Sequence, residues 1–305
     1  MRAAEAQPAR VKIGPWFDED LADLLREGEC QVIKDGPAHV LVWLDRGPGE
    51  VEHWLDADVR MVQASETGDE KWSHVIAAHP GIDFRFAAGA YSREIAEHGL
   101  ALVLALMRDL PRAMAQRSWA RLDTRELSGA TALILGHGRI GATLGSLLRD
   151  LGVRCYGLTS GQLVRPDGSR LSTTLADLLG PDRHLLPETL DIVCNVLPLT
   201  AGTRSVVGKD FFDVMGQGSY FVNIGRGGTV DQEALIEALA ARHLRGAGLD
   251  VVSPEPLPAD SRLWDLDNVI ITSHSANPER SRSRRLGRVA MENIAQRMEG
   301  KQLWD

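Results

Sequence analysis

Continuous apolar runs of strand length alternate with helical patterns from residue 131 to residue 272, and this alternation constrains the fold more than any other feature. Strands that are apolar throughout, rather than at every second residue, are buried on both faces. A parallel sheet covered by helices on both sides provides that environment, so we expect a doubly wound α/β domain. The apolar runs lie at 131–136, 153–157, 190–196, 219–224, 246–252 and 268–272, and the helical patterns lie at 139–150, 174–179, 208–215 and 231–242.

The residues on either side of this region predict a second, smaller α/β domain. Short apolar runs occur at 11–14, 39–44, 59–63 and 74–77, and residues 18–28 have helical spacing. The charged segment after residue 274 is also helical in its spacing, with Leu286, Val289, Ile294 and Met298 as inner positions, and is expected to pack back on the first domain.

The chain should therefore contain one domain inserted into another. We expect a discontinuous substrate-binding domain at 1–105 and 275–305, and a dinucleotide-binding domain at 106–274. Within the inserted domain, the polar segment 158–170 is expected to be a surface loop.

The composition is that of an ordinary globular chain and argues against several classes of partner. The chain is 44% hydrophobic and 25% charged, and its net charge of −8 argues against nucleic acid or an anionic membrane as the main partner. The apolar stretch at 99–107 is far shorter than the roughly 20 residues of a membrane-spanning helix, so we expect a buried helix there. The first ten residues are polar and small, and we interpret them as a frayed tail rather than a signal peptide.

The cysteines and histidines carry no pattern of a disulfide framework or a metal site. Cys30, Cys155 and Cys194 are scattered and odd in number, and no C-x-x-C is present. This usage fits the reducing cytoplasm. No His or Cys cluster has the spacing of metal ligands, so we expect no metal.

The stretch TALILGHGRIGATLG at 131–145 contains G-x-G-x-x-G at Gly136, Gly138 and Gly141. An apolar run precedes the pattern and an amphipathic helical segment follows it, which is the context in which the pattern binds a dinucleotide. The glycines permit a tight turn, close approach of the backbone to a pyrophosphate, and close helix packing, with the helix N-terminus facing the anion. The alternative is a strand–helix turn without a ligand, and the context favours the dinucleotide.

Six stretches together resemble the D-isomer-specific 2-hydroxyacid dehydrogenase family, and in particular its glyoxylate and hydroxypyruvate reductase branch. They are IAEHGLALVLALMR (95–108), LGHGRIG (135–141), LPLTAGT (197–203), NIGRGGTVDQEAL (223–235), GLDVVSPEPLP (248–258) and NVIITSHSAN (268–277), and they occur in the family's order. The resemblance implies a Rossmann domain inserted into a split, flavodoxin-like substrate domain. It also implies a homodimer formed through the cofactor domain, with RSWARLDTRELSG (117–129) as the dimer arm.

Reduction of a 2-keto acid requires a planar cation for the carboxylate and carbonyl oxygens, and an acid that holds a proton near pH 7. The resemblance places Arg226 in the first role and the pair His274 and Glu255 in the second. Each of the three follows a predicted strand, at the edge where ligands bind in open α/β sheets. Taken singly, Arg226 could be a surface ion-pair partner, Glu255 part of a rigid turn between prolines, and His274 a solvated histidine.

The resemblance also implies contacts with the cofactor and the substrate. It implies that the backbone N–H groups of Arg139 and Ile140 bind the pyrophosphate of the cofactor, and that Pro198 and Thr203 contact its adenosine side. Ile224 and Gly225 would lie near the nicotinamide ribose, and Asp250 would bind the nicotinamide carboxamide. In the first domain, VQASETGDE (62–70) stands where the family has a glycine-rich loop for the substrate carboxylate, which implies Thr67 and Gly68 as substrate contacts. Here that loop has one glycine, and Glu66 adds a negative charge near an anionic substrate.

The choice of dinucleotide depends on the segment after the second predicted strand. Position 157, 21 residues after Gly136, is a glycine, whereas NAD-using relatives commonly have an aspartate that accepts both ribose hydroxyls. Without that carboxylate the 2′-phosphate of NADP(H) is not repelled, and Thr159 and Ser160 offer hydroxyl donors. We therefore expect NADP(H) to be preferred, and Gly157→Asp to shift the preference toward NAD(H). The alternative is a permissive loop that holds NAD(H) by backbone contacts alone.

Two classes of function follow from the resemblance. The first is an NAD(P)-dependent enzyme that reduces small 2-keto acids, such as glyoxylate or hydroxypyruvate, to D-2-hydroxy acids. The second is a dinucleotide-sensing binding protein, like the family's transcriptional corepressor relatives. The presence of Arg226, Glu255 and His274 together favours the enzyme.

Overall fold

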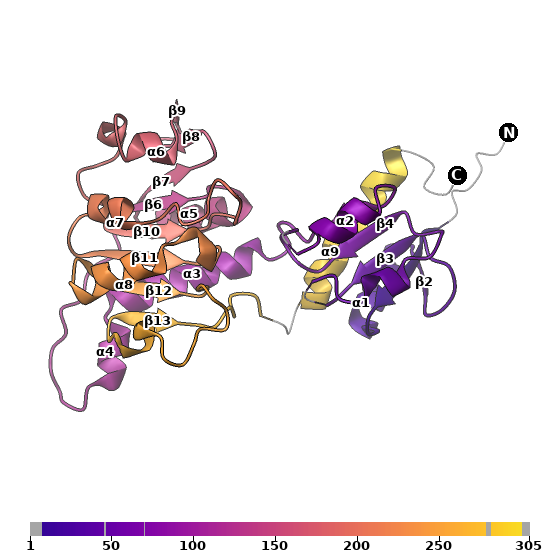
Figure 1. Ribbon diagram of the computed structural model, residues 1–305, viewed down its shortest axis with the longest axis horizontal. Helices are drawn as coiled ribbons and strands as arrows, with labels where there is room; N and C mark the ends of the chain where they lie inside the picture. Colours follow the sequence, from indigo (N-terminus) through magenta and orange to yellow (C-terminus); the bar gives the residue numbers. More distant parts are fainter. Residues whose placement is uncertain (1–7, 46, 70, 279–281, 301–305) are drawn as a thin grey trace. The chain divides into compact units, whose positions relative to one another are not determined.

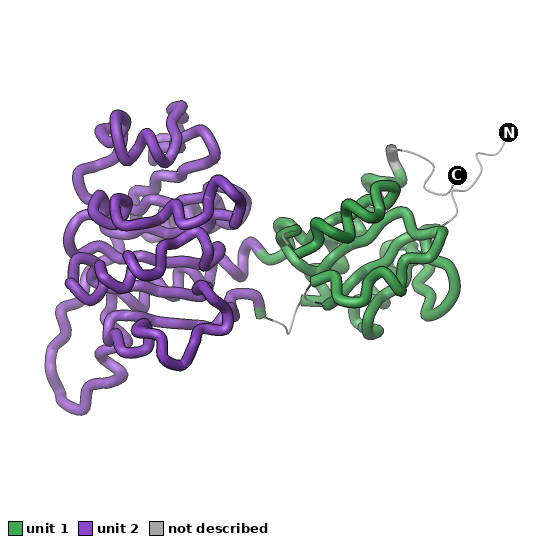
Figure 2. The backbone as a smooth tube through the Cα atoms, viewed as in Figure 1, with its two compact units in different colours: residues 1–91, 278–305 green, residues 92–277 purple. Residues whose placement is uncertain are grey.

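The computed structural model describes residues 8–45, 47–69, 71–278 and 282–300, and the chain divides into two compact units (Figure 2). Unit 1 comprises residues 1–91 and 278–305, and unit 2 comprises residues 92–277. The predicted boundary at residue 105 falls inside α3 (Ser92–Met107), which packs on α5 (Arg139–Asp150) and therefore belongs with unit 2. Most of the tail expected at 1–10, namely residues 1–7, lies outside the described residues.

Unit 1 contains a five-stranded sheet in which all neighbouring strands are parallel. The strand order is β2-β1-β3-β4-β5, which is the flavodoxin-like order, and the prediction of a flavodoxin-like domain is confirmed. The strands are β1 (Arg10–Gly14), β2 (Gln31–Ile33), β3 (Val40–Trp43), β4 (Met61–Ala64) and β5 (Asp83–Arg85). The helices are α1 (Glu19–Glu27), α2 (Ser73–Ala78) and α9 (Arg282–Gly300), with a 3-10 turn, η1, at Val51–Trp54 (Figure 1).

The apolar run at 74–77 lies in α2, in which Val75 is the buried residue, as expected for a short surface helix. One prediction for unit 1 is wrong. In α9, Leu286 and Ile294 are buried as predicted, but Met298 is 36% exposed. The end of α1 lies beside Met291, because a Cβ at the C-cap Gly28 would meet the Met291 side chain. Met298 lies roughly two turns further along α9, beyond the end of α1.

Unit 2 contains an eight-stranded sheet in the order β13-β12-β11-β10-β6-β7-β8-β9. The strands are β6 (Thr131–Leu135), β7 (Arg154–Leu158), β8 (Gln162–Val164), β9 (Arg170–Ser172), β10 (Ile192–Asn195), β11 (Ser219–Asn223), β12 (Leu244–Leu249) and β13 (Val269–Ile271). All pairs from β13 to β7 are parallel, so the predicted Rossmann-type sheet is confirmed. The prediction of a surface loop at 158–170 is wrong. Residues 162–172 form an antiparallel hairpin of β8 and β9 that extends the sheet.

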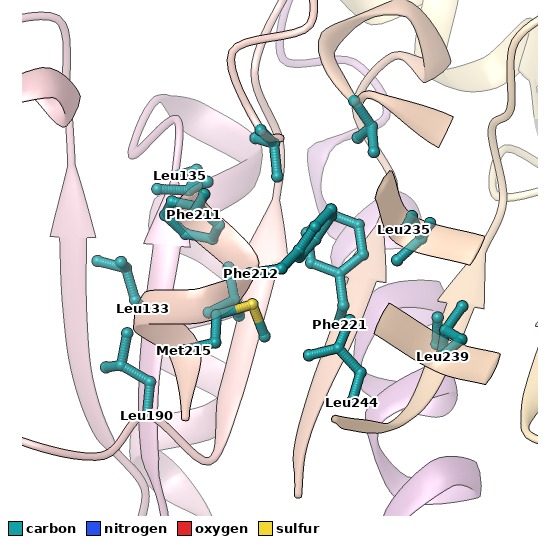
Figure 3. Close-up of a cluster of buried hydrophobic side chains, with 14 of the residues drawn as sticks. Leu133, Leu135, Leu190, Phe211, Phe212, Met215, Phe221, Leu235, Leu239 and Leu244 are labelled. Carbon is teal, nitrogen blue, oxygen red and sulfur yellow. The ribbon is translucent and has the colours of Figure 1, made fainter. Parts of the chain in front are cut away.

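Helices cover both faces of this sheet (Figure 1). Along β6, Leu133 and Leu135 point to one hydrophobic cluster, and Ala132 and Ile134 point to the other. The first cluster packs under α6 (Leu175–Leu178), α7 (Lys209–Met215) and α8 (Gln232–Ala240), where Phe212 meets Phe221 edge to face at 5.4 Å between ring centroids (Figure 3). The second packs under α3 and α5. Burial on both faces explains why these strands are apolar throughout.

Helix α3 is buried along one side rather than all round. Leu102, Val103, Leu106 and Met107 are buried, whereas Leu104 is 37% exposed. Among the described residues, no helix is both long enough and apolar enough to cross a membrane.

The topology of unit 2 brings the ends of several strands to one edge. The chain passes from β6 to β7 on one side and then returns to β10 on the other side of β6. The connections therefore diverge between β6 and β10, which is the switch point where open α/β sheets bind ligands. Because the strands from β13 to β7 are parallel, the residues that follow β6, β10, β11, β12 and β13 all lie at this edge.

Candidate functional site

The turn between β6 and α5 requires two of the three motif glycines for steric reasons. Gly136 has φ +89°, and a Cβ on it would lie 2.7 Å from the Val196 carbonyl oxygen. A Cβ on Gly141 would lie 2.3 Å from the Gly136 carbonyl oxygen. Gly138 is different: a Cβ there would meet nothing within 4 Å.

This turn has the form of an anion cradle. Helix α5 begins at Arg139, and no side chain caps its N-terminus. The first N–H groups of the helix, which include those of Arg139 and Ile140, precede the first full helical turn and lie beside the open space at Gly138. The arrangement fits the pyrophosphate of a dinucleotide.

Residues predicted for the adenosine side lie on neighbouring turns at the same edge. Pro198 and Thr203 follow β10, where the Thr203 hydroxyl accepts a hydrogen bond from the Thr200 N–H at 2.8 Å and thereby closes the turn. Thr159 and Ser160 follow β7. The Thr159 hydroxyl accepts a hydrogen bond from the Gln162 N–H at 3.1 Å and closes the β7–β8 connection, whereas Ser160 is exposed.

The predicted effect of a carboxylate at position 157 conflicts with the structure. Gly157 is buried inside β7, and a Cβ on it would lie 2.2 Å from Cδ2 and 2.4 Å from Cγ of His137. An aspartate at this position would meet the imidazole before it could reach a ribose. Gly157→Asp is therefore expected to disturb the fold of this region rather than select NAD(H).

Arg226 lies just after β11, on a backbone held by buried polar side chains. The Thr229 hydroxyl donates to the Arg226 carbonyl oxygen at 2.7 Å, and the Asn195 amide donates to the Thr229 hydroxyl at 2.7 Å. The Asn195 amide also donates to Asn223 Oδ1 at 3.1 Å, and this oxygen accepts from the Gly225 N–H at 3.1 Å. A Cβ on Gly225 would lie 2.8 Å from the Leu197 carbonyl oxygen, so the turn packs tightly against the one after β10.

His274 and Glu255 form a hydrogen-bonded pair. Nδ1 of His274 lies 2.8 Å from Oε2 of Glu255, and the Val252 N–H donates to Oε1 of Glu255 at 3.1 Å. Burial raises the pKa of Glu255, but the hydrogen bond and charge of His274 outweigh that effect, so the pKa of this carboxyl lies below its ordinary value. The side chain of His274 is 52% exposed, and its Nε2 is the nitrogen left for a ligand.

Asp250, at the end of β12, holds the turn that carries His274. Its Oδ1 accepts hydrogen bonds from the Thr272 hydroxyl at 2.7 Å and the Ser275 N–H at 2.8 Å. Its Oδ2 accepts from the Ala276 N–H at 3.2 Å, and its carbonyl oxygen accepts from the His274 N–H at 2.6 Å. The carboxylate therefore positions the turn, and its predicted bond to a nicotinamide carboxamide remains a proposal.

His98 on α3 belongs to the same network. Its Nε2 lies 2.8 Å from the Thr272 hydroxyl and 3.4 Å from Oδ1 of Asp250. Burial raises the pKa of Asp250, but hydrogen bonds from His98, Thr272 and Ser275 lower it below its ordinary value, so this carboxylate is ionised. The Thr272 hydroxyl must then donate its proton to Asp250, and His98 Nε2–H must donate to Thr272.

The residues predicted for the substrate carboxylate lie in unit 1, on the segment that follows β4. Thr67 and Gly68 are half-buried there. The charge of Glu66 is already engaged, because its Oε2 accepts a hydrogen bond from Trp72 Nε1 at 2.7 Å and its Oε1 lies 3.9 Å from Lys71 Nζ. Trp72 and Lys71 therefore reduce the electrostatic repulsion expected between Glu66 and an anionic substrate.

Sequence reasoning missed several residues that position the site, among them His98, Asn195, Asn223 and Thr229. A signal for two of them was present, because Asn195 and Asn223 each end a strand that is otherwise almost entirely apolar. Within the described part of the chain, no group of three or more His, Cys, Asp and Glu side chains could hold a metal ion.

Comparisons with known proteins agree on the family. Residues 100–276 match the family model of the D-isomer specific 2-hydroxyacid dehydrogenase NAD binding domain. The chain is 30% identical to the glyoxylate reductase/hydroxypyruvate reductase of Mus musculus over 281 residues, which cover 90% of this chain and 84% of the relative.

Solved structures share the fold. The TT0316 protein from Thermus thermophilus is 29% identical with a TM-score of 0.73, covering 96% of this chain and 97% of that protein. A D-isomer specific 2-hydroxyacid dehydrogenase from Xanthobacter autotrophicus Py2, solved with NADPH and MES, is 24% identical with a TM-score of 0.78 and covers 96% of each chain.

Proposed function

The chain belongs to the D-isomer specific 2-hydroxyacid dehydrogenase family, and we propose that it reduces small 2-keto acids of the glyoxylate and hydroxypyruvate type to D-2-hydroxy acids. It is an NAD(P)-dependent oxidoreductase. The observation that carries the proposal is the 2.8 Å contact between His274 and Glu255 at the sheet edge where Arg226 also lies. A cation for the substrate and a paired acid are the groups that this reduction requires.

Arg226 is proposed to bind the keto acid. A guanidinium presents parallel donors that match a carboxylate and an adjacent carbonyl oxygen, and it also stabilises negative charge that develops on that oxygen. The hydrogen bonds from Thr229 and Asn223 to the Arg226 carbonyl hold the base of the side chain in place. Thr67 and Gly68 of unit 1 are proposed to contact the substrate carboxylate as well.

His274 is proposed to donate the proton. Its Nδ1 is bound to Glu255, so the imidazolium presents Nε2–H to the carbonyl oxygen of the substrate, and Glu255 stabilises the charged form of the ring. In the reverse reaction the neutral imidazole accepts the hydroxyl proton. The nicotinamide dinucleotide, when bound at the glycine turn, supplies the hydride.

The cofactor is proposed to be NADP(H) in preference to NAD(H). The cradle at Gly136, Gly138 and Gly141 suits the pyrophosphate that both dinucleotides share. Thr159 and Ser160, which follow β7, carry hydroxyls rather than carboxylates, so these two residues do not repel a 2′-phosphate. Ser160 is exposed beyond the end of β7, and its hydroxyl can donate to a phosphate.

The second candidate function, a dinucleotide-sensing binding protein, uses the same glycine turn but does not need an acid. It leaves the pairing of His274 with Glu255 without a role. A panel of 2-keto acids, followed by NADPH or NADH absorbance, separates the two candidates. Binding of the dinucleotide without turnover on any keto acid would favour the sensor.

We also propose that the protein is cytoplasmic, as its cysteine usage suggests. Cys30, Cys155 and Cys194 are all buried and unpaired. Burial raises the pKa of Cys155 to about 11, which leaves the thiol unreactive and fits a structural role.

A homodimer through unit 2 is proposed from exposed apolar side chains on α4 (Leu110–Ala115) and the segment that follows it. Met114 is 86% exposed, Leu110 is 46% exposed and Trp119 is fully exposed. Such a group of apolar residues is typical of an interaction surface. Light scattering should give twice the chain mass for the wild type and a smaller mass for the double variant Met114→Ser/Trp119→Ser. A monomeric wild type would contradict the dimer.

The proton-donor role predicts a large loss of turnover in His274→Ala. We expect turnover to fall at least about 100-fold, because no other acid is proposed for the carbonyl oxygen. NADPH affinity, measured by fluorescence titration, should change little. His53→Ala, which removes an exposed histidine of unit 1, is the control. Near-normal reduction by His274→Ala would reject this residue as the donor.

The substrate role of Arg226 predicts that lysine cannot replace it. An ammonium lacks the planar pair of donors, so Arg226→Lys should raise KM for the keto acid and lower kcat, reducing kcat/KM at least about tenfold. Dinucleotide titration should be unaffected. Arg262→Lys, at an exposed ion pair with Glu233, is the matched control. A loss confined to dinucleotide binding would show that Arg226 serves the cofactor instead.

The pairing of Glu255 with His274 predicts a shift in pH dependence. The pKa of Glu255 is lowered, so the carboxylate remains charged wherever an imidazole titrates and stabilises the imidazolium. In Glu255→Gln the imidazolium loses its charged partner. The acidic limb of oxidation and the alkaline limb of reduction should therefore both move to lower pH, with Glu233→Gln unchanged. Superimposable profiles for Glu255→Gln and the wild type would contradict the pairing.

A further inference from the structure

Ser65 stands directly after β4, before the segment 66–68 that carries the proposed substrate contacts, and it is 2% exposed. Its N–H donates to the Trp43 carbonyl oxygen at 3.0 Å, and its hydroxyl donates to the Leu44 carbonyl oxygen at 3.1 Å. Its carbonyl oxygen accepts a hydrogen bond from the Tyr91 hydroxyl at 3.0 Å. The residue from which the segment departs is therefore fixed through both its main chain and its side chain.

Arg282, the first residue of α9, bridges the ends of β3 and β4. Its Nη2 donates to the Leu44 carbonyl oxygen at 3.0 Å and to the Ser65 hydroxyl at 2.6 Å. Hydrogen bonds from a charged donor are stronger than those between neutral groups. Further along the same helix, the Arg285 guanidinium lies 5.4 Å from the centroid of the Tyr91 ring, whose hydroxyl binds the Ser65 carbonyl oxygen. The start of α9 thus holds Ser65 directly and also packs on a second partner of Ser65.

The segment after Ser65 is bonded on both sides of Thr67 and Gly68. The carbonyl oxygens of Glu66 and Asp69 accept hydrogen bonds from backbone N–H groups at 2.7 Å and 2.8 Å, respectively. In the part of the chain that the structure describes, the N–H groups of Thr67 and Gly68 have no acceptor within the protein. Two successive N–H groups between fixed neighbours can bind an anionic oxygen. Their usefulness for binding depends on how firmly the neighbouring residues are held.

We propose that Arg282 is a positioning residue for the substrate. Through Ser65, it keeps the N–H groups of Thr67 and Gly68 in the geometry that binds the substrate carboxylate. This inference rests on the proposed function, which takes Thr67 and Gly68 as substrate contacts. Two donors bind one carboxylate only when both point at the same place, and a misplacement of about 1 Å is costly. The contacts of Arg282 are with oxygens of unit 1, so its effect on the substrate passes through Ser65.

The reaction chemistry decides which kinetic constant this role affects. The carboxylate of a 2-keto acid stays anionic during reduction, whereas charge develops on the carbonyl oxygen. Contacts with the carboxylate are therefore about equally strong in the ground state and in the transition state. Losing such contacts raises KM and leaves kcat nearly unchanged. Arg226, which is proposed to bind the carbonyl oxygen as well, is expected to affect both constants.

The kinetic test replaces Arg282 with methionine, which keeps an apolar stem and removes the donors. In Arg282→Met, KM for glyoxylate should rise about tenfold, with kcat within about twofold of the wild type and Kd for NADPH unchanged. Arg282→Lys should recover part of the loss, because an ammonium can still donate to the two oxygens. Arg284→Met, at an exposed position on the same helix, is the matched control and should leave KM unchanged.

A double-variant cycle tests whether Arg282 acts through Ser65. Ser65→Ala removes the hydroxyl that Arg282 binds, so it should also raise KM for glyoxylate. In Arg282→Met/Ser65→Ala, KM should rise clearly less than the product of the two single effects, since both substitutions break the same bond. A rise in KM in Arg282→Met without any rise in Ser65→Ala would show that Arg282 contacts the substrate itself, and would overturn the positioning role.

Hydrogen exchange tests the same role without turnover. Deuterium uptake is measured by mass spectrometry on the full chain, in peptides that cover residues 61–69. Uptake should be faster in Arg282→Met than in the wild type, because the Ser65 N–H is less firmly held, while peptides that cover β11 should not change. Arg284→Met should match the wild type. Identical uptake at 61–69 in Arg282→Met and the wild type would overturn the inference.

The outcomes separate this inference from the proposed function. A wild type that reduces glyoxylate, with KM unchanged in Arg282→Met, would overturn the inference and leave the proposed function standing. A wild type that reduces no 2-keto acid would contradict the proposed function, and the inference with it.

Discussion

The buried carboxylate of Asp250 is the interaction on which the proposed proton chemistry depends. It is 3% exposed, and an unpaired carboxylate in such a place would cost several kcal/mol. Its donors are the Thr272 hydroxyl and the N–H groups of Ser275 and Ala276, all from the turn that carries His274. The hydrogen bonds that compensate the buried charge of Asp250 are therefore the same bonds that hold the turn of His274 in place. Ser273 and His274 have φ values of +49° and +56°, a left-handed conformation that costs about 1–3 kcal/mol per residue and persists because these bonds hold it.

The turn that carries Arg226 is likewise held by buried polar side chains, but these side chains are uncharged. Parallel strands end at one edge of the sheet, where peptide groups lose their ladder partners and need others. At the ends of β10 and β11, the side chains of Asn195 and Asn223 supply these hydrogen-bond partners. The two amides are bonded to each other, and Asn195 is also bonded to Thr229. Because these amides are at most 1% exposed, their hydrogen bonds allow little rearrangement. Of the reacting groups proposed here, His274 is thus an exposed side chain and Arg226 a half-buried one, and both stand on buried, hydrogen-bonded supports.

The parts of the fold that could be predicted from the sequence are those with strong burial. The strands from β6 to β13 that lie inside the sheet are apolar on both faces, so their positions follow from composition alone. The strands β2, β8 and β9 have three residues each, β2 and β9 lie at sheet edges, and the apolar segment 74–77 is in a helix with one buried residue, so periodicity could not identify them. The residues Arg226, Glu255 and His274 were found through motifs, whereas His98 could not be, because its partners Thr272 and Asp250 are more than 150 residues away in the chain.

Position 157 shows why spacing from the glycine motif does not by itself give cofactor specificity. Counting residues locates the strand that approaches the ribose, but the direction of each side chain depends on the pleat and on its neighbours. Gly157 points toward α5, where the His137 ring lies, so its lack of a side chain reflects packing within the turn. The residue that fills this slot is His137, which lies between Gly136 and Gly138. Residues 137 and 157 form one steric unit, so the effect of a substitution at either position depends on the residue at the other.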